Sequence, residues 1–326
     1  MTIRLRNVVT LAAALFACAA AATALAAEGS FDRTLKVTGP VHLDVTTGSG
    51  DIHIRSGDST TVQIHGTIRA RSHWGDHASP EEKVRYLESH PPIEQDGNTI
   101  RVGHIEDREF AHNVSISFEL VVPKATELHS ETGSGGQVVD GIRGPARIGT
   151  GSGSLRISNM GDEVRAETGS GDMELDSVRG PVTAKTGSGT IRADGVAGEF
   201  TGETGSGNIH LRQTAAGAVK ADTGSGSIDL SGVNGSLRAE AGSGRITVDG
   251  APAGDWRLET GSGSINVRVP AQAAFDLHAH TSSGHISTVH PVTLQGTLSR
   301  SDWRGKVRGG GYLLDLSTGS GDVRIE

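Results

Sequence analysis

Apolar and polar residues alternate along most of the chain in short runs that are separated by glycine-rich turns. In the segment 182–199, Val182, Ala184, Ile191 and Ala193 occupy the alternating apolar positions, and a Thr-Gly-Ser-Gly turn lies between the two runs. Alternation over four or five residues is typical of a strand with one buried face. Glycine supplies the tight turns between such strands. Each unit of 18 residues therefore predicts two short strands and two turns.

The Thr-Gly-Ser-Gly turn recurs through the sequence, and for much of it the spacing is 18 residues. Its copies, including an Ala-Gly-Ser-Gly and a Thr-Ser-Ser-Gly variant, begin at Thr47, Thr132, Thr150, Thr168, Thr186, Thr204, Thr223, Ala241, Thr260, Thr281 and Thr318. A fixed period near 20 residues is typical of stacked-repeat proteins. We therefore predict an all-β fold, a two-sided β-solenoid of 18-residue coils, which we expect to be right-handed.

Equivalent residues of successive coils should stack about 4.8 Å apart and form inward columns. One expected column is Val164, Val182, Phe200, Val219, Leu237, Trp256 and Phe275. The facing column is Met173, Ile191, Ile209, Ile228, Ile246, Ile265 and Ile286. Outward positions pair basic with acidic residues, as at Lys220 and Asp222, which is typical of a solvated face.

The two ends of the chain depart from the repeat. We predict a β-rich N-terminal cap over residues 28–127, regular coils over 128–298, and a loop with a last coil over 299–326. Ser79 followed by Pro80 and two acids predicts one short helix in the cap, ending near Ser89. The last coil should leave an open strand edge unless the loop at Trp303 covers it or another molecule pairs with it, so edge-strand self-association is a candidate interaction.

Residues 1–27 have the pattern of a secretory signal peptide: a basic start, an Ala-rich apolar run and small residues near Ala26. The alternative is a lipoprotein signal, in which Cys18 is lipidated and kept. Cys18 is the single cysteine, so plain cleavage leaves a chain without disulfides. We expect an exported protein, periplasmic, on the cell surface or secreted, with no transmembrane segment once the signal is removed.

The net charge is −8, and residues 1–27 contain two arginines and no acid, so the remaining chain carries −10. This acidic balance argues against nucleic acid or an anionic membrane as a partner. Glycine is abundant with 47 residues, but its periodic placement favours an ordered fold over low complexity.

Three kinds of chemistry can be weighed on the repeat. In calcium-binding rolls an Asp follows the turn, but here Ile191 and its equivalents stand at that position. The repeated turn serines lie outside any nucleophile motif, and we expect them to form a hydroxyl ladder along the backbone. Only histidine offers metal candidates, at His278, His280 and His285, with a smaller group over residues 73–77. We predict no cofactor, no bound metal and no catalytic residues.

The Thr-Gly-Ser-Gly-x-Ile series, the segment Val45-Thr-Thr-Gly-Ser-Gly-Asp-Ile-His-Ile54 and the strand from Val114 to Pro123 resemble an exported family of β-strand-repeat candidate adhesins of unknown function. The resemblance spans about residues 31–326 and implies a non-enzymatic scaffold that binds a cell-envelope component or a cell-surface ligand. An envelope-stress accessory protein acting through a protein partner is the first alternative. A carbohydrate-active β-helix enzyme is the second, disfavoured because 18-residue coils leave no broad cleft for a pair of carboxylates.

Overall fold

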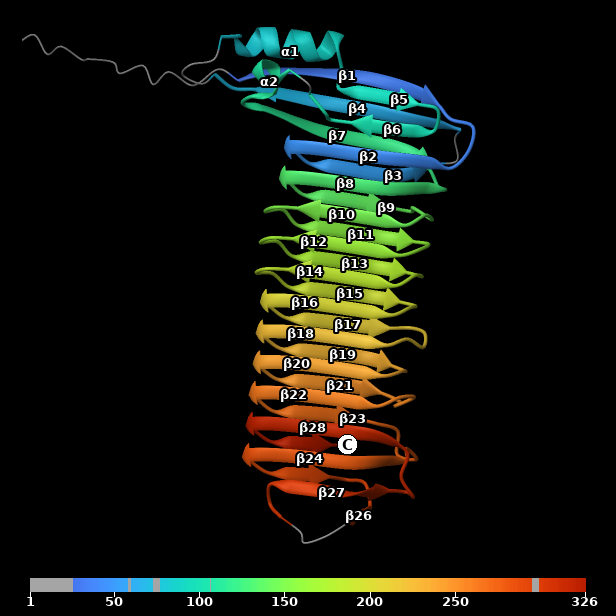
Figure 1. Ribbon diagram of the computed structural model, residues 1–326, viewed down its shortest axis with the longest axis vertical. Coiled ribbons are helices and arrows are strands. Elements are labelled where there is room, and N and C mark those ends of the chain that lie inside the picture. The colour runs from blue at the N-terminus through green and yellow to red at the C-terminus, as the bar shows by residue number, and fades with distance from the viewer. Residues whose placement is uncertain (1–25, 58–59, 73–76, 106, 295–298) are drawn as a thin grey trace, which may run out of the picture.

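The computed structural model describes residues 26–57, 60–72, 77–105, 107–294 and 299–326. They form a straight rod of two long sheets placed face to face (Figure 1). In spatial order, the 14-stranded sheet contains β1 (Ala27–Lys36), β4 (Thr61–Ala70), β7 (Val114–Pro123), β3 (Ile52–Gly57), β9 (Gln137–Asp140), β11 (Leu155–Met160), β13 (Met173–Val178), β15 (Ile191–Val196), β17 (Ile209–Gln213), β19 (Ile228–Val233), β21 (Ile246–Gly250), β23 (Ile265–Arg268), β29 (Val323–Ile325) and β25 (Ile286–Thr288). The 15-stranded sheet contains β26 (Val292–Leu294), β27 (Asp302–Val307), β24 (Phe275–Ser283), β28 (Tyr312–Ser320), β22 (Trp256–Ser262), β20 (Leu237–Ser243), β18 (Val219–Ser225), β16 (Phe200–Ser206), β14 (Val182–Thr186), β12 (Val164–Thr168), β10 (Ala146–Thr150), β8 (Thr126–Ser134), β2 (Val41–Ser49), β6 (Thr99–Val102) and β5 (Ile93–Asp96).

The predicted β-solenoid is confirmed, and its core is built from the predicted columns over most of the rod. Val182 pairs with Phe200, and Phe200 with Val219, in parallel register, and all three are buried. On the facing sheet Ile191, Ile209 and Ile228 form the opposite column with no exposed area. The apolar face of each strand is thus removed from water only by stacking coils, which makes the array cooperative along its length.

Each Thr-Gly-Ser-Gly turn forms a corner of its coil, and the backbones of successive corners lie in direct contact. A Cβ on Gly189 would lie 2.0 Å from the carbonyl oxygen of Gly171 in the neighbouring coil, so only glycine fits there. From Thr132 onward, each corner threonine donates its hydroxyl to the carbonyl of the last corner glycine in the adjacent coil, as Thr186 does to Gly171 at 3.1 Å. The expectation that the serines form this ladder was wrong: the serine side chains are exposed, whereas the threonines are buried.

At the N-terminal end, β2 and β3 already form a coil of the stack, because Thr47 pairs in register with Thr132. The chain then leaves to build the cap and returns through β8. The predicted helix α1 (Pro80–Ser89) is present, with a capping box in which Ser79 and Glu82 bond each other's backbone N–H groups. The structure adds a second, one-turn helix, α2 (Arg108–Ala111), which the sequence did not indicate.

At the C-terminal end, the last coil does not follow the others in space. The strand β28 lies between β22 and β24, and β29 lies between β23 and β25, so the chain leaves one position open and then fills it with its own C-terminus. Trp256 therefore pairs with Leu314, and Leu314 with Leu277. The prediction that Phe275 continues the column of Trp256 was therefore wrong: Leu314 and Leu277 continue it. The corners set this register, because Thr260, Thr318 and Thr281 align and each hydroxyl bonds the corner beside it.

The edge predicted to be open is covered on one sheet. The strand β27, which carries Trp303, pairs antiparallel with β24, and β26 pairs with β27. The Trp303 indole N–H donates to the Ser299 carbonyl at 2.8 Å, a local bond within the segment that leads into β27.

Candidate functional site

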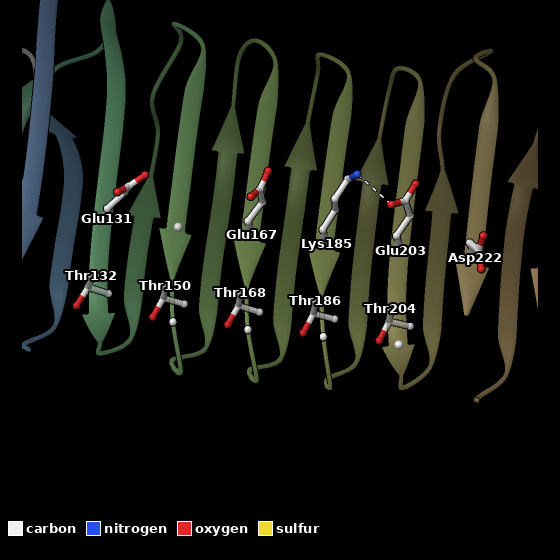
Figure 2. A pocket seen from close by; sticks show the side chains of 15 residues that line it. Glu131, Thr132, Thr150, Glu167, Thr168, Lys185, Thr186, Glu203, Thr204 and Asp222 are labelled. Atoms are coloured by element: carbon white, nitrogen blue, oxygen red, sulfur yellow. Dashed lines mark ion pairs between the residues drawn. The ribbon is translucent and has the colours of Figure 1, made fainter. Parts of the chain in front are cut away.

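A long, shallow groove runs along the outer face of the 15-stranded sheet (Figure 2). Its floor is formed where the glycine after each corner threonine leaves no side chain, as at Gly151, Gly169 and Gly187. Its wall is the outward residue directly before each corner threonine. The groove has a volume of about 700 Å³ and extends over five corners. The wall residues are Glu131, Gly149, Glu167, Lys185, Glu203 and Asp222.

One acid on this wall, Glu203, forms ion pairs with both adjacent coils. Glu203 lies between two lysines, with carboxylate oxygens 2.9 Å from Nζ of Lys185 and 2.7 Å from Nζ of Lys220. The hydrogen bond from Lys220, and then the one from Lys185, lower the pKa of Glu203. The same contact raises the pKa of Lys220. Glu203 is therefore held as an ionised carboxylate at neutral pH, suited to accepting hydrogen bonds and unsuited to donating a proton.

The outer face of the 14-stranded sheet follows the same pattern. Arg156 donates to Glu174 of the next coil at 2.9 Å, and Arg212 contacts Asp194. These pairs are exposed, so each contributes only about 0–1 kcal/mol to stability. The ion pairs therefore give the outer face of the 14-stranded sheet charged side chains that are paired between neighbouring coils.

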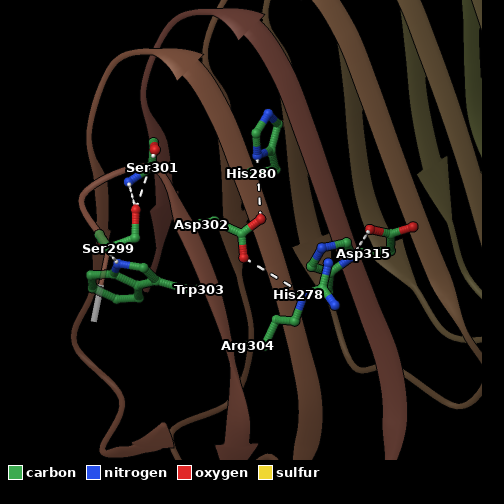
Figure 3. Close-up of polar contacts among 8 residues, drawn as sticks. All are labelled: His278, His280, Ser299, Ser301, Asp302, Trp303, Arg304 and Asp315. Carbon is green, nitrogen blue, oxygen red and sulfur yellow. Dashed lines mark hydrogen bonds and ion pairs between the residues drawn. The ribbon is translucent and has the colours of Figure 1, made fainter. Parts of the chain in front are cut away.

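The three histidine candidates lie near the C-terminal end of the rod, and the two on β24, His278 and His280, point toward different carboxylates (Figure 3). The Nδ1 atom of His278 is 2.9 Å from Asp315 of β28, and Nδ1 of His280 is 3.5 Å from Asp302 of β27. His285 is highly exposed and 3.8 Å from Asp322. Each imidazole thus lies near a different carboxylate: Asp315 and Asp302 on neighbouring strands, and Asp322 in the turn before β29. Within the described ranges, no three His, Cys, Asp or Glu side chains are arranged to hold a metal ion.

At several corners, the side chain of the residue directly after the corner glycine links neighbouring coils. Asp172 accepts the backbone N–H of Thr190 at 2.8 Å, and Asn208 accepts that of Ser227 at 2.8 Å. The position two residues beyond the corner glycine is a buried Ile, as at Ile191. The side chains therefore link neighbouring coils through their turns.

Several predictions concern residues outside the described part of the chain. The signal segment over residues 1–25, with Cys18, lies there, as do residues 73–76 of the smaller histidine group. Among the described helices, none has both the length and the apolar character needed to cross a membrane.

The cap carries a feature that the sequence analysis missed. Tyr86 of α1 lies between two other rings, with its centroid 4.0 Å from Phe110 of α2 and 4.8 Å from His90. The interplanar angles of 14° and 22° make this a stack of three rings. The spacing of Tyr86 and His90 by four residues on a helix could have indicated half of it. Phe110 comes from a separate segment, so only the tertiary structure completes it.

Comparison with known proteins gives one family match. The model of the Toastrack DUF4097 family matches residues 162–326, which is just over half of the chain. No curated protein matches the sequence.

Three solved structures share a distant likeness with this chain. A candidate cell adhesion protein from Clostridium sporogenes ATCC 15579 is 9% identical, with 92% of this chain and 99% of that chain covered and a TM-score of 0.21. A candidate lipid binding protein from Parabacteroides distasonis ATCC 8503 is 12% identical, with 91% and 96% covered and a TM-score of 0.37. A candidate adhesin from Bacteroides fragilis NCTC 9343 is 12% identical, with 91% and 97% covered and a TM-score of 0.28.

Proposed function

Since this chain belongs to the Toastrack DUF4097 family, a family of unknown function, we propose that it is a non-enzymatic, exported scaffold that binds another component of the cell envelope or a cell surface. The observation that carries the proposal is the pairing of charges between coils on both outer faces. Glu203 between Lys185 and Lys220 is the best-defined case.

Pairing of this kind supports binding over catalysis. A general acid needs a carboxyl group whose pKa is raised toward neutrality, whereas the two lysines lower the pKa of Glu203. An ionised carboxylate in a wide, shallow groove accepts hydrogen bonds from hydroxyl or amine groups of a large ligand. A rigid backbone gives such a ligand ordered contacts without the entropy cost of arranging loops.

Both ends of the rod support a discrete scaffold rather than an open fibre. At one end Glu88 of α1 accepts the backbone N–H of Ser30 on the outermost strand β1, at 3.1 Å. At the other end β26 and β27 extend the 15-stranded sheet in antiparallel fashion. Caps of this kind protect strand edges that would otherwise pair with further chains.

Saturable binding to isolated envelope tests the proposal. We expect fluorescently labelled protein to bind an envelope fraction saturably, with competition by unlabelled protein and none by heat-unfolded protein. Binding that stays linear with concentration, or release of reducing sugar from envelope polysaccharide, would contradict it. Mass spectrometry of the native N-terminus tests export separately: a start near Glu28 indicates plain cleavage, a lipidated Cys18 indicates anchoring, and an intact Met1 contradicts export.

A further inference from the structure

A second groove crosses the outer face of the 14-stranded sheet at its N-terminal end, where β4, β7, β3 and β9 lie side by side (Figure 1). We call it the cap groove, and its volume is about 600 Å³. The pairing of the strands places its central side chains in two rows. One row is Glu119, His53 and Val138, and the other is Val121, Arg55 and Asp140.

The floor of the cap groove contains two outward-facing valines. Val121 and Val138 are half-buried, and both alternate with core residues along their strands. The equivalent outward positions of the coils from β11 to β23 carry only polar or charged residues. The cap groove therefore offers an apolar surface on a face that is otherwise polar, and an apolar group of a ligand gains free energy by covering it.

Two opposite charges beside these valines are not matched within the protein. Among the residues that the structure describes, the side chains of Arg55 and Glu119 form no hydrogen bond and no ion pair, and both are exposed. By contrast, Arg156 and Arg212 on the same face contact acids of neighbouring coils. Arg55 and Glu119 are diagonal neighbours on adjacent strands, so their backbones lie about 7–8 Å apart. A ligand can therefore reach both charges at once.

The other carboxylates along the cap groove already have partners. Asp140 accepts hydrogen bonds from Ser158 and Asn159, both at 2.7 Å. Asp32, at the outer end of the groove, lies 2.9 Å from Nδ1 of His65. A purely anionic ligand would be repelled by the unmatched carboxylate, and a purely cationic one by the unmatched guanidinium. The charges of the groove therefore favour a ligand that carries both signs.

We propose that the cap groove binds a short peptide that has a free amine and a free carboxylate. The planar guanidinium of Arg55 matches a carboxylate with two parallel hydrogen bonds. The Glu119 carboxylate accepts hydrogen bonds from an ammonium group. A small apolar side chain between the two ends covers Val121 and Val138. This inference rests on the proposed binding function and names the ligand chemistry for it.

Titration of the isotope-labelled full protein with trialanine, followed by NMR, tests the site. N-acetyl-trialanine lacks the amine, and trialanine amide lacks the carboxylate. We expect trialanine to shift the amide signals of Val121 and Val138. Each blocked peptide should bind about fivefold more weakly, equivalent to about 1 kcal/mol for one exposed ion pair.

Two variants assign each end of the peptide to its side chain. Arg55→Gln should weaken trialanine and remove the preference for trialanine over its amide. Glu119→Gln should remove the preference for trialanine over the N-acetyl peptide. Both side chains are exposed and unbonded within the described chain, so neither change should disturb the fold. The matched control is Arg192→Gln, an exposed arginine on the same face but outside the groove, which should change nothing.

The peptide titrations and the envelope assay can fail independently. Equal affinity for the three peptides, no binding up to about 10 mM, or unchanged preferences in both variants overturns the cap groove as the site. A preference that depends on only one end of the peptide indicates a simple anion or cation site and also overturns it. If such results accompany saturable envelope binding, the scaffold function stands and only the site falls. If trialanine binds as expected and envelope binding is absent, the scaffold function falls instead.

Discussion

The threonine hydroxyl ladder along the corners can be tested by removing one rung. Thr223 is 1% exposed, and its Oγ1 donates to the Gly207 carbonyl at 2.9 Å. Thr223→Val preserves the shape of the side chain and removes the donor, so the half-buried Gly207 carbonyl loses this partner. A fully buried acceptor without a partner costs about 1–3 kcal/mol. Because this carbonyl is only half-buried, we expect Thr223→Val to destabilise its coil by about 1 kcal/mol, the lower end of that range.

Two neighbouring positions provide matched controls. Ser225 is in the same corner with an exposed hydroxyl, so Ser225→Ala should change stability by less than about 0.5 kcal/mol. Ala241 stands where the ladder is interrupted, beside the carbonyl of Gly226. Ala241→Thr should add the missing rung and stabilise the protein by about 0.5–1.5 kcal/mol.

The measurement must report on single coils, since a stack of repeats can unfold in parts. Native-state hydrogen exchange of the amides in β18 and β20 gives the local free energy of opening, and urea unfolding followed by circular dichroism gives the global value. Equal effects of Thr223→Val and Ser225→Ala, together with no gain from Ala241→Thr, would refute the ladder as a source of stability.

Three further predictions concern the charge pairing, the corner glycines and the C-terminal coil. Because the pKa of Glu203 is lowered from 4.5, its pairing stabilises the protein above that pH and is lost as pH falls through the folded-state value. In urea unfolding, Glu203→Gln should be less stable than the parent at pH 7, and the difference should shrink as the pH is lowered below 4.5; a difference that does not change with pH would contradict this. Gly189→Ala should cost at least about 2 kcal/mol by denaturant midpoint, because its Cβ would lie 2.0 Å from a carbonyl oxygen. The control Gly149→Ala meets its nearest atom at an ordinary 3.7 Å and should be near neutral, so equal costs would remove the close-packing argument. Deleting residues 312–326 removes β28 and β29 and leaves the position between β22 and β24 empty. We expect rapid hydrogen exchange in β24 and β27, while β14 to β20 stay protected. Slow exchange in β24 would show that β28 is not needed to hold β24 in place.

The regular part of the rod was predictable because each coil repeats the same local physics. Alternation gave the inward residues, such as Ile209 and Ile228, and the capping residues gave the start of α1 at Ser79 and Pro80. The error about the corner hydroxyls has a local cause. Serine and threonine recur with the same period, but the inward phase of Val182 and Ala184 continues to Thr186, so the alternation already indicated the threonine.

The candidate site was less predictable than the fold. The outward column that includes Lys185 and Glu203 follows from the repeat, but the pairing of Glu203 with lysines of both adjacent coils depends on side-chain reach. The buried pair Ser130 and Gln137, whose side chains bond each other inside the first coils, interrupts the apolar columns without any warning in the pattern.

The sequence by itself determined the coil, its corners and its inward columns, since these depend on residues close together in the chain. Only the tertiary structure decided the order of the coils at the two ends. Any corner offers the same hydroxyl and the same backbone edge to its neighbour, so a period cannot show that β28 pairs with both β22 and β24. The same holds for the stack of Tyr86 and Phe110, which unites two segments that no repeat connects. The residues within one coil fix its strands and turns. The packing at the two ends of the rod fixes which distant segments become neighbours.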